Sequence, residues 1–195
     1  MSLLTDFVNR EQPNHVRRVG RYYASEISYI RKGYLTANKF FDKKPIDEQG
    51  AMNILSGVFF EDGFEKMLVE QGIKHDYNPK KEIEIDDFVL VVKPDFVFPN
   101  PLVETKAPMR ITREIPEKWK DQLEVEFRAF NKPTYLGVFG NNPFRRFSID
   151  TYKYQPDDER WESIKVVLRA FHAKLIKKYG KKNETLFDTR TNRCL

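Results

Sequence analysis

The sequence predicts one α/β domain in which a mixed β-sheet core is flanked by helices. Segments with apolar residues at helical spacing alternate with segments of β-branched residues at period two, an order typical of this fold class. The length of 195 residues suffices for one domain with a hydrophobic core and is short for two. Because no internal repeat, Gly/Ser-rich linker or low-complexity tract divides the chain, we expect a single domain over residues 1–195.

Residues 1–20 are expected to form a flexible basic arm. Arg17 and Arg18, with Arg21 just after them, precede two tyrosines. Cations next to aromatic rings can bind a nucleic-acid backbone, although a solvated arm explains the same residues equally well. These three arginines are candidate DNA contacts.

Two helices are predicted next. The first begins near Ser25, a residue suited to an N-cap, and the region ends at Pro45. The second covers 48–71 and stops before Gly72, a residue suited to a C-cap. Because apolar residues recur along the second helix at helical spacing, we expect it to be buried.

One acidic residue of the second helix is unusually placed. At about 100° per residue, Glu61 falls in the middle of an apolar arc, with Glu65 close by as the second choice. The arc consists of Ile54, Val58, Phe64 and Leu68. A carboxylate on the core-facing side of a helix is costly unless it is paired or binds a cation. Glu61 is therefore a candidate functional residue.

The remaining elements are predicted from hydrophobic periodicity and from the positions of turn residues. Strands are predicted over 82–92, 94–98 and 102–106, with a turn at 99–101. An amphipathic helix over 116–131 comes next, with Pro116 in its first turn. Strands over 134–139 and 146–153 are then predicted to form a hairpin, and a last helix covers 157–179.

Charge and cysteine content restrict the partners. With 34 Lys+Arg against 29 Asp+Glu, the net charge is +5, which suits a polyanion without requiring one. Lys177 and Lys178 end the last helix, where they suit a solvated terminus or a DNA contact. The one cysteine is Cys194, so disulfide frameworks, Cys-rich zinc sites and Cys-ligated iron–sulfur clusters are excluded.

We expect an intracellular, cytoplasmic protein. The N-terminal residues lack the apolar stretch of a signal peptide, and no window approaches the ~20 apolar residues of a membrane span. The residues 180–195 are expected to form a C-terminal tail, which is a candidate contact for a second copy of the chain. The scattered histidines His15, His75 and His172 are expected to be solvated rather than metal ligands.

The strand region carries the residues best suited to chemistry. Pro94-Asp95 is followed, after eight residues, by Glu104-Thr105-Lys106. Two adjacent strands joined by a short turn can bring Asp95 and Glu104 side by side, and alternation puts Glu104 and Lys106 on one face. Phosphodiester hydrolysis needs hard oxygen ligands for Mg²⁺ or Mn²⁺ and a positive group near the scissile phosphate. Side chains of these types supply both, whereas a surface ion pair between Glu104 and Lys106 is the simpler alternative.

This pattern resembles the PD-(D/E)XK nuclease superfamily, which implies a restriction-endonuclease-like fold. The resemblance implies that Asp95, Glu104 and the backbone carbonyl of Thr105 bind the metal and that Lys106 orients the attacking water. Gly57 to Asp62 matches the helix motif that adds a further acidic ligand, here Glu61. The resemblance therefore nominates Glu61 a second time.

The chain also looks like the RecB-like branch of that superfamily, including CRISPR-associated exonucleases and small relatives from archaeal viruses. The branch carries Gln-x-x-x-Tyr on the next helix; Gln122 fills the first position, but Glu126 stands where the tyrosine is expected. An exposed polar residue is the alternative interpretation of Gln122. Members of the CRISPR-associated group usually hold a four-Cys iron–sulfur cluster, which a chain with only Cys194 cannot form, so the cluster-free, virus-type nucleases are the better match.

These observations predict a Mg²⁺- or Mn²⁺-dependent deoxyribonuclease, acting as an exonuclease or a single-strand endonuclease on DNA. Two alternatives stay open. One is a structure-specific endonuclease such as a Holliday-junction resolvase, and the other is a catalytically silent DNA-binding module of the same fold. Walker, nucleophile-elbow and dinucleotide-binding motifs are absent from the sequence.

Overall fold

A three-stranded mixed sheet forms one end of the β-structure in the computed structural model, which describes residues 17–42, 46–108, 114–142 and 145–180. Its order is β1-β4-β3, with β1 parallel and β3 antiparallel to β4. The bounds are β1 Arg21–Tyr23, β3 Lys81–Ile85 and β4 Phe88–Val92. The expected single strand over 82–92 is wrong, because the chain reverses at Asp86, whose φ is 52°. Asp tolerates this left-handed conformation, and a hairpin preserves the period-two pattern that suggested one strand.

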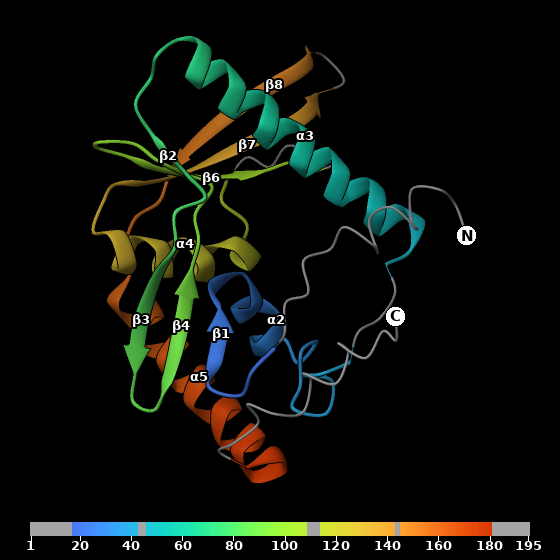
Figure 1. The fold of residues 1–195 in the computed structure, drawn as a ribbon, viewed down its shortest axis with the longest axis vertical. Coiled ribbons are helices and arrows are strands. Elements are labelled where there is room, and N and C mark those ends of the chain that lie inside the picture. The colour runs from blue at the N-terminus through green and yellow to red at the C-terminus, as the bar shows by residue number, and fades with distance from the viewer. Residues whose placement is uncertain (1–16, 43–45, 109–113, 143–144, 181–195) are drawn as a thin grey trace, which may run out of the picture.

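A five-stranded mixed sheet lies on the other side and has the order β2-β5-β6-β7-β8 (Figure 1). The bounds are β2 Asp76–Tyr77, β5 Phe96–Val97, β6 Leu102–Lys106, β7 Thr134–Asn142 and β8 Arg145–Lys153. β6 and β7 are parallel, and the other neighbours are antiparallel. The α/β class with mixed sheets is confirmed, but the strands divide into two sheets instead of one. The two-residue β2 was missed, because it is too short to show a periodicity.

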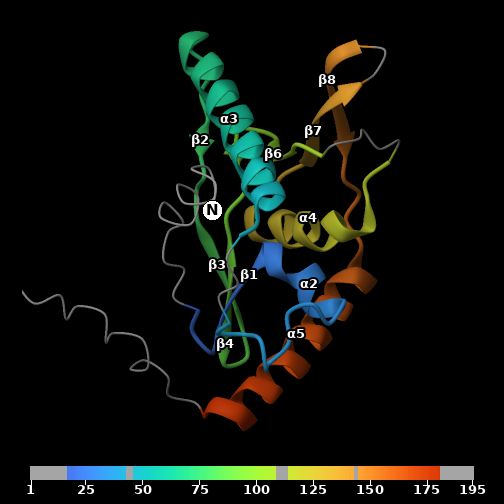
Figure 2. The ribbon, with the colours of Figure 1, turned by 90° about the vertical axis from the view of Figure 1, so that its right-hand side faces the viewer.

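The helices flank both sheets. Their bounds are the 3₁₀ turn η1 Ala24–Glu26, α2 Ile27–Arg31, α3 Glu48–Glu70, α4 Glu117–Phe130 and α5 Asp158–Tyr179. Figures 1 and 2 show α3 and the β7–β8 hairpin at one end of the molecule and the C-terminal half of α5 at the other. Among the described residues, no helix is long and apolar enough to cross a membrane.

The expectation that the second helix is buried is wrong for α3. Ala51 and Leu68 are its buried residues, and the Phe59 side chain is 71% exposed. The apolar residues of α3 occur on several sides of the helix, so one sheet cannot cover them all. Phe60 stacks on Phe139, which anchors α3 to β7.

The main core joins β1 and β4 to α2 and α5. Tyr22, expected in the basic-aromatic stretch, is fully buried there, and its hydroxyl lies 2.6 Å from Nδ1 of His172. His172 is only 6% exposed, so its expected solvation is wrong: α5 turns this residue inward. The His75 side chain is also only 6% exposed, because its ring packs against those of Phe96 and Phe98. His15 lies outside the described residues.

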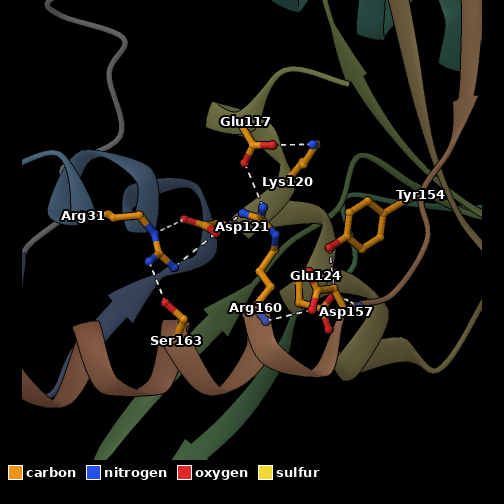
Figure 3. Close-up of polar contacts among 9 residues, drawn as sticks. All are labelled: Arg31, Glu117, Lys120, Asp121, Glu124, Tyr154, Asp157, Arg160 and Ser163. Atoms are coloured by element: carbon orange, nitrogen blue, oxygen red, sulfur yellow. Dashed lines mark hydrogen bonds and ion pairs between the residues drawn. The ribbon is translucent and has the colours of Figure 1, made fainter. Parts of the chain in front are cut away.

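α4 lies between the two sheets and is held by a polar network (Figure 3). Asp121, only 2% exposed, accepts from Nε of Arg31 at 2.8 Å and from Arg160 at 2.9 Å. Arg31 comes from α2 and Arg160 from α5, so a single buried carboxylate ties three helices together. Arg31 also donates to Ser163 of α5 at 2.8 Å.

Replacing Asp121 with Asn is expected to lower the free energy of unfolding by about 1–3 kcal/mol, because both arginines lose the buried anion that they share, although Arg160 keeps its exposed partner Glu117. Urea unfolding measures this change. The matched control is Asp86→Asn, which removes an exposed carboxylate bound to Arg169 and should change stability by less than about 0.5 kcal/mol. Equal effects of the two substitutions would show that the buried network does not hold the helices together.

Candidate active site

Strand register brings the two predicted carboxylates face to face. In the antiparallel pair of β5 and β6, Phe96 lies opposite Val103 and Val97 opposite Leu102. One further step in this register puts Asp95 opposite Glu104. Asp95 lies directly before β5, which begins at Phe96. The short turn that the sequence indicated between the strands therefore produces the expected juxtaposition.

Asp95 is buried and held from one side. Its Oδ2 accepts from the backbone N of Thr105 at 2.7 Å and from the Thr105 hydroxyl at 2.6 Å. Burial, followed by the negative charge of Glu104, raises the pKa of Asp95 to about 8. The folded chain thus keeps this carboxyl in an environment that disfavours its charge unless a cation compensates it.

Glu104 and Lys106 point to the same face, as alternation along β6 predicts. Lys106 Nζ donates to Oε1 of Glu104. Burial lowers the pKa of Lys106, but the carboxylates of Glu104 and Asp95 outweigh it and hold that pKa above its usual value. Because Glu104 is only 2% exposed, the alternative of a surface ion pair does not describe this contact.

Gln122 reaches the same carboxylate from α4. Its Nε2 donates to Glu104 Oε1 at 2.6 Å and to Glu126 Oε1 at 2.8 Å. The structure therefore places Gln122 against the carboxylate cluster rather than on a free helix surface. Glu126, which sequence reasoning noted only as a departure from the family pattern, belongs to the cluster. Its spacing of four residues from Gln122 was the signal that could have identified it.

Glu61 faces this cluster from α3. Burial, and then the charge of Glu104, raises its pKa, and Glu61 in turn helps to raise the pKa of Asp95. Glu65 lies next to a different residue, His75, with 3.8 Å between Oε1 of Glu65 and Nε2 of His75. Of the two glutamates that the helix pattern offered, Glu61 is the one that acts electrostatically on the cluster.

The donor set suits a hard divalent cation in its chemistry. Oε2 of Glu104 and Oε2 of Glu126 are buried and have no hydrogen-bond partner among the described residues. Near them, Lys106 is the cation that compensates several carboxylates. Oxygen ligands of this kind are those that Mg²⁺ and Mn²⁺ prefer. In the described part of the chain, however, no three His, Cys, Asp or Glu side chains gather in a group that could hold a metal.

The predicted DNA-contacting residues lie apart from these carboxylates. Arg17 pairs with Glu26 at 2.9 Å, and Arg21 pairs with Glu82 at 2.5 Å. Arg18 is exposed just before β1. The exposed Lys177 and Lys178 lie near the C-terminal end of α5, at the end of the molecule opposite α3. Residues 1–16 of the expected arm and 181–195 of the tail fall outside the described residues.

No protein-family model and no curated protein sequence matches this chain. Solved structures do match. SSO0001 has a TM-score of 0.64 at 16% identity, with 86% of this chain and 82% of that chain covered. An alkaline exonuclease from Laribacter hongkongensis has 0.59 at 15% identity, covering 83% and 90%. A phage-related exonuclease from Haemophilus somnus has 0.53 at 13% identity, covering 81% and 96%. The chain has the fold of these three proteins, two of which are described as exonucleases.

Proposed function

We propose that this protein is a Mg²⁺- or Mn²⁺-dependent deoxyribonuclease that acts as an exonuclease. The observation that carries the proposal is the convergence of Asp95, Glu104, Lys106 and Gln122 at one place between β5, β6 and α4. Several buried carboxylates beside the ammonium of Lys106 are expensive to assemble for stability alone. A site that binds a cation and a phosphate accounts for this cost.

Each side chain has a distinct role in the proposal. Asp95 and Glu104 would hold the cation, with Glu61 and the backbone carbonyl of Thr105 as further ligands. When bound, the cation supplies Lewis-acid activation of the phosphate and a more acidic water. Lys106 places a positive charge where negative charge develops on the phosphate, and Gln122 orients water or substrate. The arginines and lysines predicted to contact DNA would hold the rest of the polymer.

The exonuclease mode is favoured by the fold comparison. Two of the structures with this fold are described as exonucleases, and the Laribacter hongkongensis enzyme has also been solved with dAMP, a deoxynucleotide. Within the superfamily we place this chain with the RecB-like nucleases that lack an iron–sulfur cluster. Gln122 on α4 and the single cysteine at Cys194 support this placement.

An assay on four DNA substrates tests the proposal. End-labelled single strands, linear duplexes, covalently closed circles and four-way junctions are incubated with Mg²⁺, Mn²⁺ or EDTA. We expect degradation of linear DNA only with a metal, and no cleavage of closed circles, because an exonuclease needs an end. Preferential cutting of the junction would instead identify a resolvase. Salt-sensitive binding without cleavage would identify a silent DNA-binding module.

A further inference from the structure

Two fully buried glutamates lie on α4, and they differ in their surroundings. Glu124 accepts from Arg128 at 2.7 Å. It also accepts from the Tyr154 hydroxyl at 2.7 Å and from the backbone N of Asp157 at 3.0 Å (Figure 3). Donors from three places thus satisfy it, as a structural carboxylate requires. Glu126 lacks such a set of donors, so packing of the helix does not explain why a carboxylate is buried there.

The hydrogen-bond partner of Glu126 is Gln122. Oε1 of Glu126 accepts from Gln122 Nε2 at 2.8 Å, and its Oε2 is buried with no hydrogen-bond partner in the part of the chain that the structure describes. The positive charge of Lys106 on β6 attracts Glu126, but the hydrogen bond that Glu126 makes to a described residue is the one from Gln122. Glu126 is therefore placed to act on the amide of Gln122, one helical turn before it.

The amide of Gln122 has two N–H protons and one carbonyl oxygen. One proton goes to Glu104 at 2.6 Å and the other to Glu126 at 2.8 Å. Since both neighbours are carboxylates, a flipped amide would turn its carbonyl oxygen toward two acceptors. The pair of carboxylates therefore sets a single orientation, in which the carbonyl oxygen of Gln122 is directed away from both.

We propose that Glu126 is a positioning residue that locks the amide of Gln122 in this orientation. With Glu126 in place, the NH₂ group stays on Glu104 and the carbonyl oxygen is presented to a donor at the reaction centre, such as the hydrolytic water. The catalytic consequence rests on the proposed nuclease function, whereas the orientation of the amide does not.

Three variants separate the acceptor from the charge of Glu126. Glu126→Gln keeps a carbonyl oxygen that can accept from Gln122, and Glu126→Leu removes the acceptor. An apolar replacement of a buried ionisable group need not destabilise the fold, and thermal unfolding verifies this. Glu124→Gln is the matched control, because it perturbs a buried glutamate of the same helix that makes no contact with Gln122.

The first readout is independent of activity. In ¹H–¹⁵N spectra of the metal-free protein, assigned with Gln122→Ala, the side-chain amide protons of Gln122 should exchange about two- to tenfold more slowly than those of the exposed Gln71, the range expected for one ordinary hydrogen bond. The protection should persist in Glu126→Gln and in Glu124→Gln and be lost for one proton in Glu126→Leu. Unchanged protection in Glu126→Leu would overturn the proposal.

The second readout is a double-mutant cycle in the nuclease assay. Glu126→Leu should lower the cleavage rate by about 10- to 100-fold, as loss of a supporting partner typically does, and Glu126→Gln by less than about threefold. In a Gln122→Ala background, Glu126→Leu should have no further effect. A further loss in that background would show that Glu126 acts independently of Gln122. An equal loss in Glu126→Gln would show that Glu126 acts through its charge. Either result would overturn the proposal. A wild-type protein without nuclease activity would reject the proposed function and leave the spectroscopic result to decide the positioning role.

Discussion

Asp95→Asn is expected to abolish Mn²⁺ binding and DNA cleavage together, whereas Lys106→Met abolishes most cleavage and leaves Mn²⁺ bound. Asp95 is a proposed ligand, so its loss should reduce the cleavage rate by more than about 100-fold, beyond the usual effect of an outer partner. Lys106 is proposed to stabilise charge on the phosphate, a contribution of about 10²- to 10³-fold. Isothermal titration with Mn²⁺ and single-turnover cleavage measure the two effects separately.

The control variants remove the same kinds of side chain, a carboxylate and a lysine, at positions outside the candidate site. Asp86→Asn removes a carboxylate from the β3–β4 turn, and Lys165→Met removes a lysine that pairs with Glu162 on α5. Both controls should cleave DNA at the wild-type rate. Loss of Mn²⁺ binding in Lys106→Met, without loss of fold, would contradict the division of roles between the two residues.

The metal-free protein is expected to lose stability between pH 4 and pH 8, and Asp95→Asn is expected to remove part of that loss. The pKa of Asp95 is about 8 in the folded chain against an ordinary value of 3.8. The folded state therefore binds this proton more tightly than the unfolded state. The resulting contribution is complete below about pH 4 and is lost as the pH rises through about 8. Asparagine stays neutral and avoids this loss.

Thermal unfolding in EDTA at several pH values between 4 and 9 tests the prediction. The Tm of Asp95→Asn minus that of the wild type should increase with pH up to about 8 and then level off. Glu61 and Glu126, whose pKa values are also raised, are present in both proteins, so the difference reports the loss of the Asp95 charge together with its effect on these two neighbours. A difference that is constant over this range would show that Asp95 ionises as in water. We therefore expect Asp95→Asn to increase the stability of the metal-free protein and to remove its nuclease activity.

Local patterns predicted the centre of the site well. Alternation along β6 places Glu104 and Lys106 together, and a short turn brings Asp95 opposite Glu104. Both relations involve residues within about one hairpin of each other, where the period of a strand decides which way side chains point. The bounds of β6, α3 and α5 were also close to the prediction, because each has a clear period or a clear end.

Contacts between distant segments were predicted poorly. The pattern around Tyr22 suggested a nucleic-acid contact, but β1 pairs with β4, more than 60 residues later, and buries this ring. α3 was expected to be buried, since apolar residues recur along it at helical spacing, yet Phe59 is 71% exposed. Periodicity describes one element at a time and does not say which other element will pack against it.

The sequence by itself determined the α/β class, the order of most elements and the pairing of Asp95 with Glu104 and Lys106, because these depend on local period, turn residues and register. Only the tertiary structure decided that α4 carries Gln122 and Glu126 to the carboxylates of β6, that Glu61 faces them from α3, and that the predicted basic residues lie elsewhere. The physical reason is that the packing of a helix on a sheet depends on the shape and burial of both surfaces. The net charge suggested a polyanionic partner, but the packing of the elements decided which charged side chains lie next to one another.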